Sequence, residues 1–143
     1  MDQPASAPVY IGHSTALKDD LSAREALQFL AGLHGRAADG ARIDAALQRL
    51  QVQQHSRRSV RTLSQGQRRR VALARLALEE QPALWVLDEP FDALDTAGVA
   101  TVLQLLREHL QRGGAAILTS HLPFDLPGLP LQTLDLDARS THA

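Results

Sequence analysis

The stretches Leu63–Gln67 (LSQGQ) and Leu84–Pro90 (LWVLDEP) decide the fold of this chain. Ala83–Leu87 is an uninterrupted apolar run of five residues, which predicts a strand buried on both faces. The run leads directly into Asp88 and Glu89. Because ligands of open parallel sheets bind beyond the carboxyl ends of strands, both carboxylates are expected at a ligand-binding edge.

This acidic pair has chemistry suited to phosphate esters. The carboxylate of Asp88 could hold a hydrated magnesium ion that bridges nucleotide phosphates, and Glu89, one residue further out, could polarise an attacking water. Taken alone, the pair has a plainer explanation, namely a solvated acidic turn after a buried strand.

The LSQGQ stretch predicts the start of a helix. Ser64 and Gln67 have the spacing of a capping box, and Gly66 allows close approach of a ligand to the backbone. A helix N-terminus of this kind can bind an anion, although an ordinary capped helix explains the same letters. The helix is expected to run to about Glu80, because Pro82 follows as a stop.

The remaining pattern alternates helices and strands, and it predicts an α/β fold. Residues 1–20 form a leading segment with a short strand, residues 21–81 a helical subdomain, and residues 82–143 part of a parallel sheet. The expected elements are the strand Val9–Ile11, a helix opened by a Ser22/Glu25 capping box and stopped by Gly35, a helix over Ala41–Leu50, a helix over Thr96–Gln111 and a strand over Ala115–Thr119 that ends at Ser120-His121.

Composition excludes several classes of function. The chain has 15 basic and 16 acidic residues, so its net charge of -1 gives no general attraction to nucleic acid. It contains no cysteine, which removes disulfides and thiol catalysis, and its histidines lack the spacing of a zinc site. Its apolar stretches are far shorter than the roughly 20 residues that span a bilayer.

The order of the motifs resembles that of the ATP-binding cassette family. LSQGQ is followed by RRRVALARLAL, LWVLDEP, Ala93-Leu94-Asp95 and a strand that ends in Thr119-Ser120-His121. The resemblance extends from Tyr10 to His121. It implies the C-terminal part of a P-loop NTPase domain, with a helical subdomain and a partial parallel sheet, and it implies ATP and Mg²⁺ as cofactors.

The resemblance also implies roles for individual residues. Asp88 matches the aspartate that holds magnesium, Glu89 the general base and His121 the switch histidine at the γ-phosphate. Asp95 matches a loop that contacts the opposite subunit. The signature residues Ser64, Gly66 and Gln67 would bind the ATP held by that subunit. His13 falls where most relatives carry a glutamine that senses magnesium and the attacking water. The resemblance therefore implies that His13 takes the place of this glutamine.

Four details narrow the resemblance to the ATP-binding subunit of the haem exporter used in cytochrome c maturation. They are the Gly12-His13 pair, the run ALKDDLSAREAL, the stretch WVLDEPFDALD and an early end after His121. This implies an ATPase that couples hydrolysis to transport, a second ATPase subunit in a homodimer and membrane-embedded partner subunits. It also implies a peripheral location on the cytoplasmic face of the inner membrane.

A phosphate-cradling loop, G-x-x-x-x-G-K-[ST], does not occur in the sequence, whose single lysine is Lys18. We therefore expect weak nucleotide binding and an inactive isolated chain. Because the family resemblance implies that the missing strand lies beside Ala83–Leu87, we also expect that strand to have an exposed edge. We expect either that the sequence is a fragment, that its translation start is misplaced, or that a partner covers the exposed edge.

Two other functions stay open on this pattern. The chain could be a non-catalytic remnant that donates its signature to the ATP site of a partner. An ATPase of the same superfamily in DNA repair or translation is disfavoured, because such proteins usually carry long insertions or a second cassette. The arginines around the signature, Arg57, Arg58, Arg61 and Arg68–Arg70, are expected on a solvated helix face, with phosphate binding or docking to a membrane partner as alternatives.

Overall fold

The structure is a computed structural model that describes residues 7–36 and 38–135. Its elements, in chain order, are β1 (Val9–Ile11), α1 (Ala23–Leu33), α2 (Gly40–Arg49), the short 3₁₀ helices η1 (Gln53–His55) and η2 (Val60–Thr62), α3 (Gln65–Leu73), the 3₁₀ helix η3 (Ala74–Leu78), β2 (Leu84–Leu87), α4 (Thr96–Gln111) and β3 (Ala115–Leu118). Among the described residues, no helix is long and apolar enough to span a membrane.

The three strands form a parallel sheet in the order β1-β2-β3. Ile11 pairs with Leu87, and Leu87 pairs with Leu118, so all three strands end at the same edge. The expectation that β2 has an exposed edge is wrong, because β1 and β3 occupy its two sides. β1, which pairs with one side of β2, lies more than seventy positions earlier in the chain. Local sequence patterns do not reveal such a distant pairing.

The two faces of β2 differ in burial. Trp85 and Leu87 are fully buried, whereas Leu84 and Val86 are half-buried. On the second face, Tyr10 and Ile117 flank Val86 in register and are 59% and 61% exposed. The prediction of burial on both faces is therefore correct for one face only, since the described residues leave the other largely uncovered.

The helical elements begin and end close to where their sequence signals predict. Ser22 caps α1 in a reciprocal capping box with Glu25, and α1 ends before Gly35, whose φ is +71°. Asp39, which the sequence analysis did not name, caps α2 by accepting a hydrogen bond from the Arg42 amide. These caps satisfy backbone groups that would otherwise lack partners at the helix ends.

The helix that starts at Ser64 is shorter than predicted. α3 ends at Leu73 and continues as the tighter helix η3, instead of running as one α-helix to about Glu80. Leu73, Ala74 and Leu76 are each at most 1% exposed. Because this segment is buried on several sides, its packing determines where the α-helix changes to a 3₁₀ helix. The spacing of apolar residues in the sequence does not predict that change.

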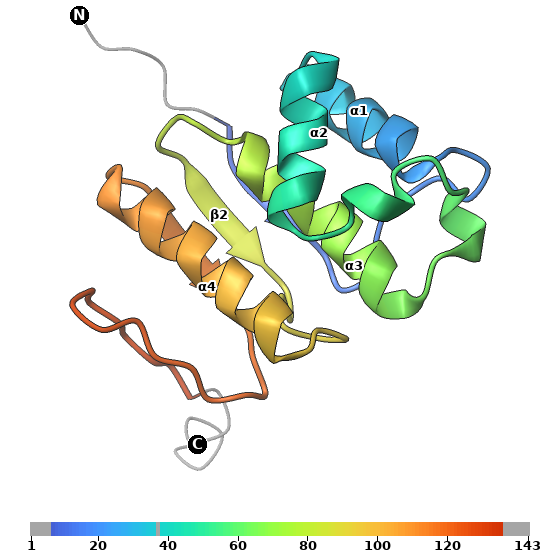
Figure 1. Cartoon of the computed structure of the whole chain (residues 1–143). Helices are drawn as coiled ribbons and strands as arrows, with labels where there is room; N and C mark the ends of the chain where they lie inside the picture. Colours follow the sequence, from blue (N-terminus) through green and yellow to red (C-terminus); the bar gives the residue numbers. More distant parts are fainter. Residues whose placement is uncertain (1–6, 37, 136–143) are drawn as a thin grey trace, which may run out of the picture.

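One cluster of buried apolar side chains connects the helices with the sheet. In Figure 1, α1, α2 and α3 form a group beside the strands, and α4 lies along the sheet. Members of the cluster from the helical group and from the sheet with α4 are Val9, Leu27, Leu47, Leu73, Trp85 and Leu106. The predicted domain borders after residues 20 and 81 stay predictions.

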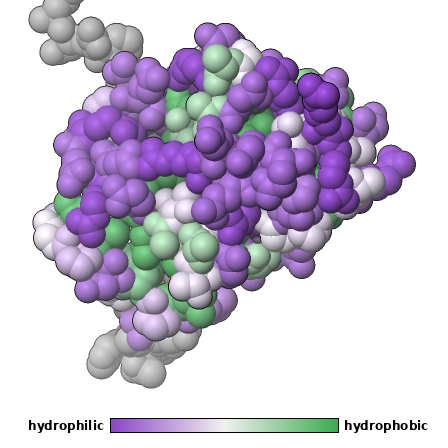
Figure 2. All heavy atoms as spheres, viewed as in Figure 1, coloured by the Kyte–Doolittle hydropathy of each residue, from purple (hydrophilic) through white to green (hydrophobic). Residues whose placement is uncertain are grey.

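The segment after β3 returns along α4 (Figure 1). Arg107 of α4 donates a hydrogen bond to the Pro127 carbonyl at 2.9 Å, and Leu126 is buried. Phe124 lies against Phe91, with ring centroids 5.3 Å apart. Figure 2 shows hydrophilic side chains over most of the helical group on this side, with a hydrophobic area toward α4 and the returning segment.

Candidate functional site

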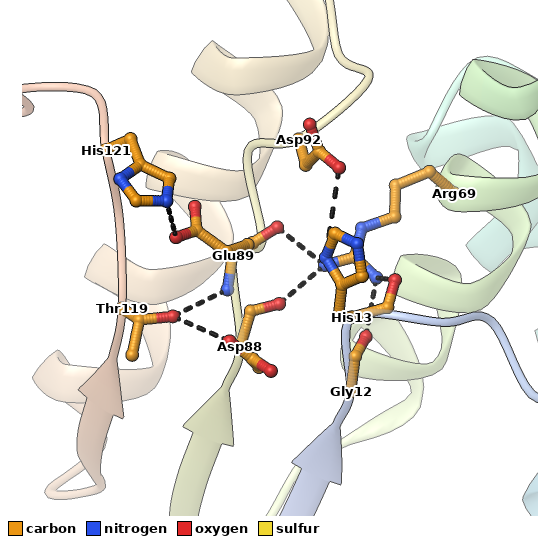
Figure 3. A network of polar contacts seen from close by, with 8 residues as sticks. All are labelled: Gly12, His13, Arg69, Asp88, Glu89, Asp92, Thr119 and His121. Carbon is orange, nitrogen blue, oxygen red and sulfur yellow. Dashed lines mark hydrogen bonds and ion pairs between the residues drawn. The ribbon is translucent and has the colours of Figure 1, made fainter.

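Three loops meet at the carboxyl edge of the sheet, as Figure 3 shows. Gly12 and His13 follow β1, Asp88 and Glu89 follow β2, and the third loop, after β3, carries Thr119 and His121. The common register of the strand ends brings these loops together. Asp88, Glu89, His121 and His13, which the sequence predicted as site residues, therefore share one edge.

Glu89 and His121 are in direct contact. The His121 Nε2 atom lies 3.0 Å from Glu89 Oε1. The Glu89 side chain is 20% exposed, whereas that of His121 is 92% exposed. Glu89 has a φ of +51°, an uncommon left-handed conformation for a non-glycine residue. Backbone strain of this kind occurs at functional sites, where the surrounding structure holds it in place.

Thr119 ties the acidic pair to β3. Its hydroxyl donates to Asp88 Oδ1 at 2.8 Å and accepts from the Glu89 amide at 2.9 Å. In the sequence, Thr119 stands out only as part of a predicted strand end. A hydroxyl residue directly after the strand that pairs with β2 is the signal that could have identified it, because its register places it beside Asp88.

The surroundings of Asp88 fit one kind of metal ion. One carboxylate oxygen is taken by Thr119, and the other has no hydrogen-bond partner among the described residues. Residues 7–36 and 38–135 contain no group of three or more metal-ligating side chains. A protein-caged metal therefore does not fit here. A Mg²⁺ ion held by one carboxylate, water and phosphate oxygens does fit.

His13 lies at the border of the site. Its Nδ1 is 3.9 Å from Asp92 Oδ2, and both side chains are more than half exposed. Such an exposed pair contributes little to stability. The expected role of His13 as a substitute for glutamine stays a prediction.

Arg69 departs from the expectation that the arginines lie on a solvated face. It is 3% exposed, and its guanidinium donates to the carbonyls of Gly12, Asp88 and Glu89 at 2.7, 2.9 and 2.7 Å. Burial lowers the pKa of Arg69 from its usual value. Arg75 is also buried, at 5% exposure. Arg57, Arg58 and Arg61 are exposed as expected, but Arg57 and Arg58 do not lie in a helix, and Arg68 and Arg70 are half-buried.

The signature residues lie at the start of α3. The Ser64 hydroxyl accepts from the Gln67 amide at 3.1 Å, and Gln67 Oε1 accepts from the Ser64 amide at 2.9 Å. The Gln67 side-chain nitrogen also lies 3.1 Å from His55 Nε2, a contact that the sequence analysis missed. None of the polar contacts among the described residues joins Ser64 or Gln67 to the acidic pair. The side-chain hydrogen bonds of Ser64 and Gln67 therefore stay at the start of α3 and next to η1.

Asp95 is held by contacts within its own chain. Its carboxylate accepts from the Gly98 amide at 2.9 Å and from Arg70 at 2.5 Å, which makes it the N-cap of α4. The hydrogen bond from Gly98 lowers the pKa of Asp95, and Arg70 lowers it further. Asp95 therefore has a structural role as the cap of α4, in addition to any contact with another subunit.

One concave region lies away from the carboxyl edge of the sheet. It is formed by Pro8, Pro82, Leu84 and Gly113 at the opposite end of the strands, and it contains none of the site residues. Its walls carry no titratable side chain. The carboxyl edge, where carboxylates, a histidine and a threonine converge, is the better candidate on chemical grounds.

A profile of the ABC transporter family matches residues 2–92, which include β1, the helical group, β2 and the acidic pair. This chain belongs to the ABC transporter family. Its fold is the α/β fold of the ATPase domain of that family, with a helical group and a partial parallel sheet. A dimeric ATP-binding cassette in a post-hydrolysis state, bound to ADP and phosphate, superposes with a TM-score of 0.69 at 24% identity, covering 81% of this chain and 53% of that one.

Two curated relatives share nearly half of their matched residues with this ABC transporter chain. The cytochrome c biogenesis ATP-binding export protein CcmA of Albidiferax ferrireducens is 49% identical over 90% of the chain. The protein of the same name from Methylococcus capsulatus is 49% identical over 84%. The chain spans 61% and 58% of the length of these relatives.

Proposed function

We propose that this chain serves as the ATP-binding and ATP-hydrolysing subunit of an ABC exporter in cytochrome c-type biogenesis, with haem as the exported compound. The contact between Glu89 and His121, next to Asp88 at the carboxyl edge, carries this proposal. The similarity to two export proteins of cytochrome c biogenesis supports the biological setting.

The residues at this edge divide the chemistry among themselves. The Glu89 carboxylate accepts a proton from the water that attacks the γ-phosphate, and His121 orients Glu89 while it contacts a γ-phosphate oxygen. Asp88 would hold Mg²⁺, which would neutralise charge on the phosphates. His13, beside Asp92, would contact the attacking water.

The signature residues serve a second subunit. The N-terminus of α3 carries Ser64, Gly66 and Gln67, and its first-turn amides provide donors for an anion. No contact links this group to Glu89 in the described residues, which supports its use at the ATP of a partner copy in a homodimer. Asp95 would lie at the interface between the subunits.

The proposed location is the cytoplasmic face of the inner membrane, where the subunit attaches peripherally to membrane-embedded partners. The word "export" in the names of both relatives supports a membrane partner. Nucleic acid is not a proposed partner, because 15 basic residues are balanced by 16 acidic ones.

One observation favours an alternative role for residues 1–143 taken alone. These residues contain no G-x-x-x-x-G-K-[ST] loop, and their one lysine, Lys18, lies 4.5 Å from the centre of the Phe29 ring, where it makes a cation–π contact. We propose that they bind ATP weakly and are inactive alone, and that they donate their signature to the ATP of a partner. Micromolar ATP affinity in a titration of the purified chain would refute this alternative.

Substitution of the general base tests the main proposal. In the exporter purified with this chain as its ATPase subunit, we expect Glu89→Gln to lower kcat roughly 10²–10⁴-fold, because the amide cannot accept the proton. ATP binding should persist, since the amide is isosteric with the carboxylate and the phosphate contacts remain. Glu80→Gln is the matched control, because Glu80 is exposed and pairs with Arg42 outside the site. Undiminished hydrolysis by Glu89→Gln would remove Glu89 from the role of base.

A further inference from the structure

The buried guanidinium of Arg69 connects two loops of the site with the signature helix. One terminal nitrogen donates to the Gly12 carbonyl at 2.7 Å and to the His13 carbonyl at 3.4 Å. The other donates to the carbonyls of Asp88 and Glu89 at 2.9 and 2.7 Å. The Nε atom is buried and has no hydrogen-bond partner among the described residues. Within residues 7–36 and 38–135, every hydrogen bond of this side chain therefore goes to these two loops (Figure 3).

We propose that Arg69 is the positioning residue that fixes the backbone of Glu89, and with it the direction of the base, relative to His13 and to α3. This inference rests on the proposed function and deepens it. Arg69 lies in the same helix as Ser64, five positions later. Contact of a nucleotide with the start of α3 would therefore act on the helix that holds the base.

The left-handed backbone of Glu89 explains why a positioning residue is needed. A non-glycine residue at a φ of +51° is strained, and it keeps this conformation only when neighbouring groups hold it. Thr119 holds the Glu89 amide from the side of β3. Arg69 holds the Glu89 carbonyl from the side of α3, with a charge-assisted hydrogen bond. The residue is thus held at both ends of its backbone.

Arginine suits this place better than lysine does. Its planar fork presents several donors in fixed directions, so that one group can reach two loops at once. A lysine ammonium keeps the charge and most of the stem, but it cannot span both loops with the same geometry. Arg69→Lys therefore removes the fork and retains the charge.

Arg75 provides a matched control. It is buried to a similar degree, at 5% exposure, its Nε also lacks a partner, and burial lowers its pKa as it does for Arg69. Its guanidinium donates to the Tyr10 carbonyl at 3.1 Å, within β1. In the part of the chain that the structure describes, it makes no hydrogen bond to the loop after β2. A general effect of removing a buried arginine should appear equally in Arg75→Lys.

The first test measures amide hydrogen exchange in the purified chain for the wild type, Arg69→Lys, Arg69→Met and Arg75→Lys. The Asp92 amide donates to the Glu89 carbonyl at 3.1 Å, so this amide is expected to be protected from exchange in the wild type. We expect residues 88–94 to exchange at least about tenfold faster in the Arg69 variants than in Arg75→Lys. Equal exchange in all variants would overturn the proposal. If Arg69→Met does not fold, Arg69→Lys decides the result.

The second test measures ATP turnover in the assembled exporter. We expect Arg69→Lys to lower kcat by roughly 10²-fold with little change in KM, because a misplaced base slows the chemical step more than it weakens binding. Arg75→Lys should retain kcat. A wild-type kcat for Arg69→Lys would overturn the positioning role. A wild-type assembly without ATP turnover would instead refute the proposed function, and the exchange result would still show whether Arg69 holds the loop.

Discussion

Gly66 combines two demands in one residue. A Cβ atom built on Gly66 would lie 2.8 Å from the Ala93 carbonyl oxygen, in the loop that follows the acidic pair. Ala93 itself has a φ of +61°. The absence of a side chain at Gly66 therefore lets α3 approach this loop, whether or not a phosphate is bound. The signature glycine is consequently part of the packing as well as a proposed ligand contact.

Gly66→Ala should destabilise the chain without any nucleotide. The added methyl group meets a backbone oxygen that cannot rotate away, which costs about 1–3 kcal/mol in the free energy of unfolding. Gly32→Ala is the matched control, because its added Cβ has nothing within 4 Å and Gly32 lies in α1, where alanine should stabilise by roughly 0.5–1 kcal/mol. Urea unfolding followed by the fluorescence of Trp85, the one tryptophan, measures both. A Gly66→Ala variant as stable as wild type would contradict the packing argument.

At the scale of elements, the chain uses the same capping box twice. Ser22 with Glu25 opens α1, and Ser64 with Gln67 opens α3. The hydrogen bonds from the amide to the serine hydroxyl are 3.1 Å long in both boxes. The two serines therefore make equivalent structural contributions, while only Ser64 is proposed to contact ATP.

Paired substitutions separate capping from catalysis. Ser22→Ala and Ser64→Ala should each lower the free energy of unfolding by about 1 kcal/mol, since each removes one N-cap. In the assembled exporter, only Ser64→Ala should reduce ATP turnover, because it also removes a donor to the partner's γ-phosphate. Thermal unfolding and steady-state hydrolysis measure the two effects. Equal turnover for the two variants would leave Ser64 with a capping role alone.

Local patterns predicted the elements well because their signals are local. Caps and stops indicated the bounds of α1 and the end of α4, apolar spacing gave α2 within one residue, and apolar runs gave β2 and β3. The path of the chain after Leu73 was not predictable, since enclosure by distant segments tightened it into a 3₁₀ helix. Which strands flank β2 was missed for the same reason, because pairing joins residues that are far apart in the sequence.

The candidate site shows the same division. Asp88, Glu89 and His121 could be named from motif order, and the structure places them together. Motif order did not indicate Arg69 or Thr119, because their partners are backbone groups and a carboxylate in loops that follow β1 and β2. An arginine in a basic run usually lies in solvent, and only its contacts reveal a buried one.

At the scale of the whole molecule, His109 joins α4 to the sheet. Its ring stacks on Trp85 at a centroid distance of 3.8 Å, and its Nε2 lies 2.9 and 3.0 Å from the carbonyls of Ala83 and Ala115, at the starts of β2 and β3. The side chain is fully buried. Burial lowers the pKa of His109 below its usual value, although both carbonyls act in the opposite direction.

This arrangement makes the stability of the fold depend on pH. The unfolded chain binds a proton at His109 below a pKa of about 6.5, whereas the folded chain keeps the ring neutral to lower pH. Its contribution is therefore complete above about pH 6.5 and decreases as the pH falls below that value, until the lowered pKa of the folded state is reached. The slope from this one group is at most about 1.4 kcal/mol per pH unit.

We expect the free energy of unfolding, measured by urea titration of Trp85 fluorescence, to decrease between pH 7.5 and pH 5.5. His109→Gln is the control: it should be less stable at pH 7.5, because the stacked ring is lost, but its stability should change less with pH. Desolvation also lowers the pKa of His34, so that residue contributes a slope of the same sign, which both proteins share. The difference between the two pH profiles thus isolates His109, and parallel profiles would show that its protonation is not linked to folding.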